Sequence, residues 1–212
     1  MSLGNLVLIR HGESEWNLLG KWTGWTDVSL TPKGTSDAVK MGELVKDIKF
    51  DFIYTSTLKR SIETMRGVMS LKNKNDLEFT PVKAIDERDY GDYTGMNKWE
   101  VKERVGEAKF NAIRRNFKEP IPNGETLADV YNRAVPWYKE EVIPKLLDGK
   151  NVLIVAHGNS IRALVKYIEN ISDDDISKFE MPFGKILIYQ VDDLGHIKNR
   201  SELTAHITPT KA

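Results

Sequence analysis

The 212-residue chain carries 31 Lys and Arg against 31 Asp and Glu, so no overall charge marks it as a binder of nucleic acid or of an anionic membrane. With 40% hydrophobic residues it can bury a sizeable core, and we expect a single domain over residues 1–212. The absence of cysteine excludes a disulfide framework and a thiolate nucleophile. No apolar run approaches the roughly 18 residues that span a bilayer, and the first residues do not resemble a signal peptide, so we expect a cytoplasmic protein.

Short β-branched or aromatic segments predict strands, and longer stretches with helical periodicity lie between them. The predicted strands cover residues 5–9, 51–56, 77–85, 151–156 and 185–191. The predicted helices cover residues 30–48, 57–70, 125–147 and 160–171. This alternation favours an α/β fold with three layers, α/β/α, in which helices cover both faces of a mostly parallel sheet.

Two of the predicted helices contain recognisable start or break signals. Thr31 is expected to cap the helix over 30–48, with Pro32 at its first position. Pro136 and Pro144 predict a kink or break within the helix over 125–147. The polar stretch over about 90–124 has no strand pattern, and we interpret it as a helical insertion above the edge of the sheet.

Two predicted strands end in nearly the same way, with a histidine followed by a glycine. His11 lies in "LVLIRHGES" and His157 in "VLIVAHGNS", and in each case a serine follows that could cap a helix. In open α/β sheets, ligands bind beyond the carboxyl ends of the strands. A lone histidine there would more often satisfy a strand-end hydrogen bond, but the repeated junction favours a shared function. His196 and His206, in a polar turn and a polar tail, are assigned no function.

The residues beside these histidines favour a phosphate ligand. Free backbone amides beyond Gly12 and Gly158 attract an anion, and Arg10 can grip phosphoryl oxygens with two parallel hydrogen bonds. A neutral imidazole can attack phosphorus when its other nitrogen is held as a donor, so His11 would become a phosphohistidine. Metal binding is the alternative for paired histidines. It usually needs nearby carboxylates, whereas the neighbours here are cations, so we expect no metal.

Seven motifs then establish a resemblance to a known family. In order, they are "RHGESEWN", "TGWTDVSLTPKG", "YTSTLKRSIET", "DERDYG", "GMNK", "RR" and "AHGNSIRALVKY". Their order and approximate spacing, from about residue 6 to 192, resemble the cofactor-dependent phosphoglycerate mutases of the histidine phosphatase superfamily. The insertion over about 90–124 would then lie over the active site.

This resemblance implies a reaction and its partners. The enzyme would interconvert 2-phosphoglycerate and 3-phosphoglycerate in glycolysis and gluconeogenesis, by way of a phosphohistidine and 2,3-bisphosphoglycerate. The bisphosphoglycerate also primes the enzyme, and no metal is required. The implied partners are small phosphoglycerates, with no nucleic acid and no membrane. Whether copies of the chain form a homo-oligomer is left open.

The resemblance also implies roles for individual residues. His11 would be the phosphorylated nucleophile, and Glu87 of "DERDYG" the general acid and base. Arg10, Arg60 and His157 would complete a cationic pocket around the transferring phosphoryl group. Taken alone, Arg60 would be a solvated helix charge, and a salt bridge to Arg10 or Arg60 is the alternative for Glu87. The implied substrate contacts are Ser14, Asn17, Thr23, Gly24, Arg88, Tyr90, Lys98, Arg114, Arg115, Gly158 and Asn159.

Two departures from the family leave other functions open. The chain passes from "RRNF" through "KEPIPNGET" where many mutases carry a longer loop, and "SELTAHITPTKA" follows soon after the last predicted strand. The family's tail closes over the site, so a shorter one bears on how well phosphohistidine is protected from water. One alternative is therefore a broad-specificity histidine phosphatase that hydrolyses small phosphate esters. A less favoured one is an inactive phospho-ligand-binding module, because His11, Glu87 and His157 are all present.

Overall fold

A six-stranded sheet forms the centre of the protein, for which the computed structural model describes residues 3–72 and 78–207. The strand order across the sheet is β3-β2-β4-β1-β5-β6. The strands are β1 (Leu6–Arg10), β2 (Phe52–Thr55), β3 (Thr80–Pro81), β4 (Val152–Ala156), β5 (Lys185–Val191) and β6 (Ile197–Thr204).

The first four strands in that order pair in parallel, β5 runs in the opposite direction, and β6 runs in the same direction as the first four. β4 pairs in parallel with both β1 and β2, and all five of its side chains are buried. β5 pairs antiparallel with β1, and β6 antiparallel with β5. Arg10 at the end of β1 lies opposite Ala156 at the end of β4. The residues that follow these two strands therefore emerge side by side at one edge of the sheet.

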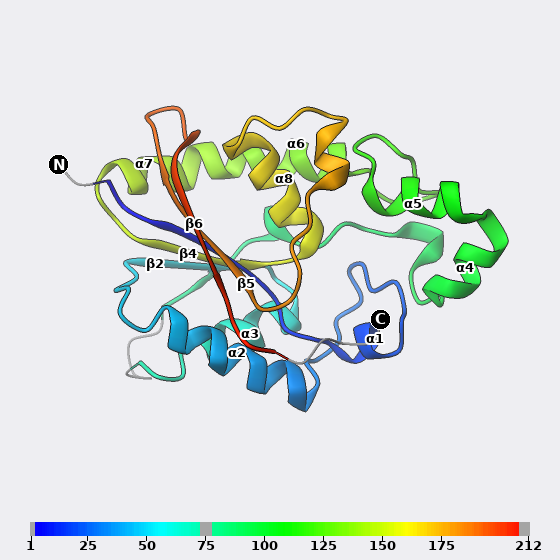
Figure 1. The fold of residues 1–212 in the computed structure, drawn as a ribbon, viewed down its shortest axis with the longest axis horizontal. Coiled ribbons are helices and arrows are strands. Elements are labelled where there is room, and N and C mark those ends of the chain that lie inside the picture. The colour runs from blue at the N-terminus through cyan, green and yellow to red at the C-terminus, as the bar shows by residue number, and fades with distance from the viewer. Residues whose placement is uncertain (1–2, 73–77, 208–212) are drawn as a thin grey trace.

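Helices cover both faces of the sheet, which confirms the predicted three-layer arrangement (Figure 1). One face carries α6 (Leu127–Trp137), α7 (Ile143–Leu147) and α8 (Gly158–Ile168), and the other carries α2 (Pro32–Leu44) and α3 (Lys59–Val68). Successive residues of β1 alternate between the two layers. Leu6 and Leu8 pack in a buried cluster with residues of α8, whereas Val7 and Ile9 pack in another with residues of α2 and α3.

The start and break signals in the sequence have direct structural counterparts. The Thr31 hydroxyl accepts a hydrogen bond of 3.0 Å from the Gly34 amide at the start of α2, so the predicted cap is confirmed. Pro136 lies inside α6 and Pro144 near the start of α7. A π-helical turn, Tyr138–Val142, separates the two helices. The predicted interruption of this long helical segment is therefore confirmed.

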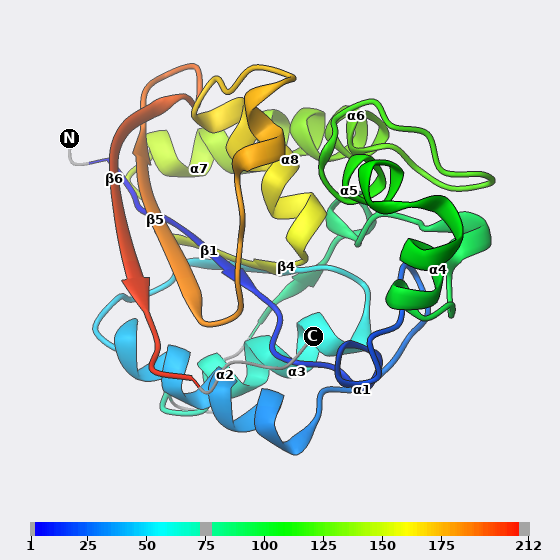
Figure 2. The ribbon, with the colours of Figure 1, turned by 45° about the vertical axis from the view of Figure 1, so that its right-hand side comes forward.

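The segment predicted as an insertion forms short helices beside the carboxyl edge of the sheet (Figure 2). They are η3 (Gly91–Tyr93), α4 (Lys98–Val105) and α5 (Glu107–Arg115), and α1 (Glu15–Leu18) lies nearby. Trp22 and Phe110 belong to a buried cluster of this region. Gly91 has a φ of +47°, and a Cβ there would lie 2.1 Å from the Pro122 carbonyl oxygen. Glycine is therefore required where the two ends of the insertion meet.

Two strand predictions were wrong. Of the predicted strand over 77–85, residue 77 lies outside the described residues, and only Thr80–Pro81 pair with β2. Lys83–Ile85 instead form a 3₁₀ turn, η2. The Val82 amide still donates to the Thr55 carbonyl at 2.8 Å, and the pairing ends where the chain turns into η2.

The second correction concerns the segment after β5, which we predicted as a polar turn and tail. Residues 197–204 form β6, so the stretch beginning at Ser201 is partly strand. β6 pairs only with β5 among the described strands, and most of its side chains are exposed. A 3₁₀ turn, η5 (Asp175–Lys178), precedes β5. Within the described residues, no helix is long and apolar enough to cross a membrane.

Candidate active site

The two predicted histidines lie close together at the carboxyl ends of two neighbouring parallel strands. His11 follows β1 and His157 follows β4, and their ring centroids lie 4.9 Å apart. Both side chains are buried, with exposed fractions of 3% and 0%. Their proximity follows from the parallel pairing of β1 with β4, which aligns the ends of the two strands.

The geometry of His11 leaves one ring nitrogen free to act as a nucleophile. Its Nδ1 lies 2.6 Å from the carbonyl oxygen of Gly12. Because a carbonyl only accepts, Nδ1 carries the proton, and Nε2 of the neutral ring keeps its lone pair. Burial, together with the charges of Arg60 and Arg10, lowers the pKa of His11 well below its ordinary value. The ring is therefore neutral at pH 7.

His157 is held in a similar neutral state beside it. Its Nε2 lies 2.6 Å from the Ser56 hydroxyl, and burial, Arg60 and His11 lower its pKa well below the ordinary value. Its backbone amide donates to the Ser160 hydroxyl at 3.1 Å. α8 begins at Gly158, so His157 occupies the cap position that we predicted for the serine. Two neutral imidazoles can lie this close without charge repulsion.

Two arginines contribute buried positive charge to the site. Arg60, 1% exposed, donates to the carbonyls of Thr26 at 3.0 Å and Gly24 at 2.8 Å, so it also fixes that loop. Arg10 donates to the carbonyl of Met181 at 2.8 Å. In both arginines the Nε is buried and has no hydrogen-bond partner among the described residues. These N–H groups are available to a bound oxyanion.

Glu87 is held by amides rather than by an arginine side chain. Its Oε1 accepts from the Arg88 amide at 2.8 Å, from the Asn159 amide at 3.3 Å and from Asn159 Nδ2 at 3.0 Å. The carboxylate is 8% exposed. The salt bridge to Arg10 or Arg60 that the sequence left open does not account for its position. A carboxylate with a remaining oxygen at the site can exchange a proton with a substrate.

A cavity of about 660 Å³ opens next to these groups. The predicted site residues that line it are Arg10, Glu87, Tyr90, Lys98, Arg114, Arg115, Gly158 and Asn159. Its other lining residues are Trp22, Arg162, Glu180, Met181, Pro182, Phe183, Thr204, Ala205 and Ile207. His11 and His157 are not lining residues themselves, but each adjoins one in the chain, Arg10 and Gly158, and the His11 ring meets that of the lining residue Phe183.

The cavity concentrates positive charge that is poorly compensated. Burial, followed by the charges of Arg114 and Arg10, lowers the pKa of Lys98 to about 8. Burial and the neighbouring Arg115 also lower the pKa of Arg114. Arg115 forms an ion pair with the exposed Glu180. A ligand with more than one anionic group would relieve this repulsion between like charges.

Five other predicted substrate contacts lie outside the cavity lining. The Ser14 hydroxyl donates to Asn17 Oδ1 at 2.8 Å, and together these side chains form the capping box of α1. The carbonyl of Gly24 is bound by Arg60, and the hydroxyl of Thr23 is buried without a hydrogen-bond partner among the described residues. Arg88 is fully buried, and its Nη2 donates to the Ile113 carbonyl near the end of α5 at 2.8 Å.

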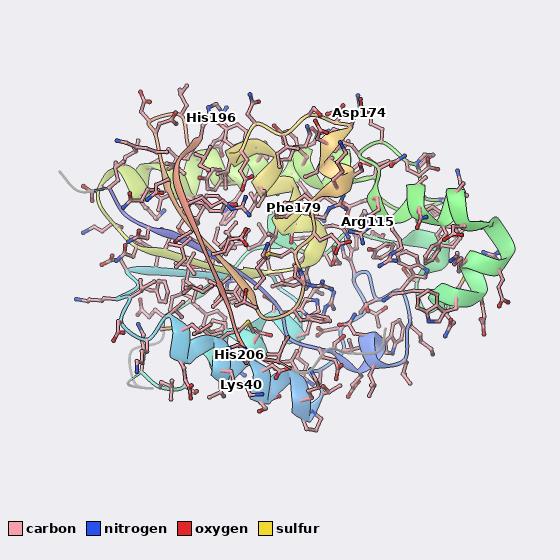
Figure 3. The ribbon with its side chains drawn as sticks, in the orientation of Figure 1. Lys40, Arg115, Asp174, Phe179, His196 and His206 are labelled. Carbon is pink, nitrogen blue, oxygen red and sulfur yellow. The ribbon has the colours of Figure 1, made fainter. Side chains whose placement is uncertain are left out.

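Arg162 is a site residue that the sequence reasoning missed. It lies one turn after Asn159 on α8 and donates to Asn159 Oδ1 at 3.1 Å. It also donates to the carbonyls of Arg114 at 3.2 Å and Arg115 at 2.6 Å. Arg115 lies at the end of α5 nearest α8 (Figure 3). The spacing of Arg162 from Asn159 was the one signal in the sequence that placed it on the same helix face.

The other two histidines of the chain are not among the cavity-lining residues, although His206 lies between two that are, Ala205 and Ile207. His196 and His206 are found beyond opposite ends of β6, outside the cavity lining (Figure 3). Across residues 3–72 and 78–207, no group of three or more His, Cys, Asp or Glu side chains could hold a metal ion.

This combination of fold and site has known counterparts. Residues 6–200 match branch 1 of the histidine phosphatase superfamily, which defines the class of protein. The chain is 39% identical to a 2,3-bisphosphoglycerate-dependent phosphoglycerate mutase from Corynebacterium diphtheriae, over 94% of this chain and 90% of that protein. A mutase of the same name from Cytophaga hutchinsonii is 40% identical over 96% and 95% of the two chains. The chain therefore belongs to the 2,3-bisphosphoglycerate-dependent phosphoglycerate mutase family of this superfamily.

Solved structures also share the fold. Bacillus stearothermophilus YhfR matches with a TM-score of 0.79 and 27% identity, over 92% of this chain and 95% of that one. A mycobacterial glucosyl-3-phosphoglycerate phosphatase in complex with VO3 matches with a TM-score of 0.79 and 21% identity, over 97% and 100% of the two chains.

Proposed function

We propose that the protein interconverts 2-phosphoglycerate and 3-phosphoglycerate by way of 2,3-bisphosphoglycerate, as a cytoplasmic enzyme of glycolysis and gluconeogenesis. The observation that carries the proposal is the neutral His11 with a free Nε2, next to a cavity lined by several cations. The names of the curated relatives support the same substrates. The proposed partners are small phosphoglycerates, and the reaction proceeds without a metal.

The phosphoryl transfer uses the side chains at the carboxyl ends of the parallel strands. Nε2 of His11 attacks phosphorus of the bisphosphoglycerate, the N–P bond forms and the P–O bond to the substrate breaks. Glu87 gives its proton to the departing oxygen and takes one back when the other hydroxyl is phosphorylated. Arg10, Arg60 and His157 surround the charge that develops on the transferring group.

A second set of cations serves the part of the substrate that does not react. Lys98 on α4, with Arg114 and Arg115 on α5, lines the cavity from the insertion. Their role is to hold the carboxylate and the second phosphate while the bisphosphoglycerate reorients. By resemblance to the family, we also propose substrate contacts for Ser14, Asn17, Thr23, Gly24, Arg88, Tyr90, Gly158 and Asn159.

The phosphoenzyme is the direct test of this function. Incubation with 2,3-bisphosphoglycerate should add one phosphoryl group that is labile in acid and stable in base, and the His11→Ala variant should lack it. Intact-mass spectrometry measures the adduct, with His196→Ala as the matched histidine control, because His196 and its chain neighbours are not cavity-lining residues. An adduct that persists in His11→Ala would exclude His11 as the nucleophile.

A phosphatase is the second candidate, because several solved structures with this fold are named as phosphatases. The two functions separate in one coupled assay of mutase turnover and phosphate release, with and without bisphosphoglycerate. A mutase needs the bisphosphoglycerate and releases little phosphate. If the protein hydrolyses phosphate esters rapidly and shows no phosphoryl transfer that depends on bisphosphoglycerate, its function is that of a phosphatase and not of a mutase.

A further inference from the structure

One wall of the cavity is apolar and has no part in the reaction as described so far. Met181, Pro182 and Phe183 precede β5, and Ala205 and Ile207 follow β6. All five residues line the cavity together with the cations of the insertion and α8. The cavity is therefore lined by positively charged side chains from one set of elements and by apolar side chains from another.

Phe183 is the residue of this wall whose side chain contacts both Arg10 and His11. The guanidinium carbon of Arg10 lies 4.1 Å from the centroid of its ring. The same ring meets the His11 ring edge-on, with 6.0 Å between the centroids. A guanidinium over an aromatic face is held by a cation–π interaction. With the bond from Arg10 to the Met181 carbonyl, the stacking fixes both the plane and one edge of the guanidinium.

The backbone behind Phe183 is anchored to β6. Gly184 has a φ of +77°, which only glycine adopts without strain, and its carbonyl accepts a 2.9 Å hydrogen bond from the Ala205 amide. A Cβ at Gly184 would lie 2.9 Å from the Cδ1 of Ile207. The turn after Phe183 therefore packs tightly against the chain that leaves β6, and the ring has a fixed support.

We propose that Phe183 is a positioning residue that orients Arg10 toward the phosphoryl group and keeps water away from the phosphohistidine at His11. This inference rests on the proposed function and deepens it, because it names a residue that sets the ratio of phosphoryl transfer to hydrolysis. An apolar ring beside the phosphorylated imidazole occupies space that a water molecule would otherwise take.

The step that Phe183 suppresses is hydrolysis of the phosphoenzyme. The oxygen of a water molecule attacks phosphorus, the N–P bond breaks, and its electron pair returns to Nε2 of His11. The water loses a proton to solvent, and inorganic phosphate leaves. The products are the neutral enzyme and phosphate, so each such event costs the enzyme its primed state.

The test measures the lifetime of the phosphoenzyme in the full chain. The protein is primed with 2,3-bisphosphoglycerate, freed of it by rapid desalting, and quenched in base at intervals for intact-mass spectrometry. The variants are Phe183→Ala, which removes the ring, Phe183→Tyr, which keeps it, and Phe183→Leu, which keeps apolar volume without a flat face. Phe52→Ala is the matched control, because Phe52 also lies beside a cation, Lys145, but outside the cavity lining.

We expect Phe183→Ala to shorten the lifetime at least tenfold, while Phe183→Tyr and Phe52→Ala stay within twofold of the unmutated protein. Phe183→Leu should keep the lifetime within threefold but raise the KM for phosphate esters at least threefold, since Arg10 loses its stacking partner. An unchanged lifetime in Phe183→Ala would overturn the shielding role. An unchanged KM in Phe183→Leu would overturn the positioning role.

The same experiment separates this inference from the proposed function. If the unmutated protein forms no phosphoenzyme, the proposed function fails and this inference fails with it. If the phosphoenzyme forms, and disappears equally fast in Phe183→Ala and in the unmutated protein, only the inference about Phe183 fails.

Discussion

Each acid–base group at the site is set by its immediate partners. The Gly12 carbonyl fixes the tautomer of His11, and the amides of Arg88 and Asn159 fix the carboxylate of Glu87. Neither arrangement needs a charged partner. A substitution that keeps the shape of Glu87 can therefore test its proposed proton transfer without disturbing the local structure.

Glu87→Gln should lower mutase turnover by about 100- to 10,000-fold, the usual cost of losing a general acid or base. The side-chain carbonyl oxygen of the introduced amide can accept the same hydrogen bonds, so the melting temperature should change little. Steady-state kinetics and rapid-quench measurement of phosphoenzyme formation check the effect. Turnover near that of the unmutated protein would remove Glu87 from the role.

The lowered pKa of Lys98 predicts a pH dependence of substrate capture. With a pKa of about 8, Lys98 loses its charge as the pH rises through that value. Because kcat/KM reports the ionisations of the free enzyme, kcat/KM for 2,3-bisphosphoglycerate should fall above about pH 8. In Lys98→Arg the fall should be absent or shifted upward, because a guanidinium stays charged. Identical profiles for the two proteins would contradict this assignment.

At the residue scale, the sequence predicted the positions whose neighbours are set by sheet pairing. His11, His157 and Arg10 follow from two parallel strands that end in register. Arg162 and Phe183 could not be predicted in this way. Arg162 donates to backbone carbonyls 47 and 48 residues away, and the partner of the Phe183 ring is the guanidinium of Arg10, at the end of β1. Such contacts depend on tertiary packing, which the motif does not encode.

Among the helices, α5 is held at its carboxyl end by hydrogen bonds from two buried arginines. Arg88 donates to the carbonyl of Ile113, and Arg162 donates to those of Arg114 and Arg115. The last carbonyls of a helix have no partner within the helix and attract positive charge. These contacts connect α8 to the end of the helix that carries Arg114 and Arg115 to the cavity.

Arg162→Met should therefore weaken binding of phosphoglycerates more than it affects a simple aryl phosphate. Hydrogen bonds from a charged group are worth about 1.5–3 kcal/mol, so the KM for 3-phosphoglycerate should rise about tenfold or more. The measurement compares KM and kcat for both substrates, with melting temperatures to monitor folding. Arg200→Met is the matched control, since Arg200 forms ion pairs with Glu169 and Glu202 instead.

A partial recovery in Arg162→Lys would support the role of the charge at this position. Equal losses for the two substrates in Arg162→Met would instead indicate that Arg162 only stabilises the fold.

The strand predictions were right where the side chains of a strand are buried, and wrong for the two outermost strands of the sheet, β3 and β6. β4 is an unbroken apolar strand between two neighbours, so its pattern is unambiguous. β6 is held by backbone hydrogen bonds to β5, and most of its side chains are exposed. An edge strand of this kind has no alternation to detect. This missed strand matters because the residues that follow it, Ala205 and Ile207, line the cavity.

At the scale of the whole molecule, the architecture places two separate sets of cationic or histidine side chains at the site. Arg10, Arg60 and the two histidines come from the carboxyl edge of the sheet, whereas Lys98, Arg114 and Arg115 come from the helical insertion. A mutase must retain its bisphosphorylated intermediate while that molecule reorients, since the phosphate placed on one hydroxyl must leave from the other. A phosphatase needs no second set.

Because only a mutase needs the second set of cations, we predict that Lys98→Ala and Arg115→Ala reduce mutase turnover far more than hydrolysis of an aryl phosphate. Each charge-assisted contact is worth about 1.5–3 kcal/mol, so each variant should lose mutase turnover by about 10- to 100-fold. The ratio of phosphate release to transfer should rise, because the intermediate escapes before the second transfer. Lys102→Ala is the matched control. Lys102 lies on α4, as Lys98 does, but it pairs with Glu107 and is not among the cavity-lining residues. Equal losses of both activities would show that Lys98 and Arg115 only shape the cavity.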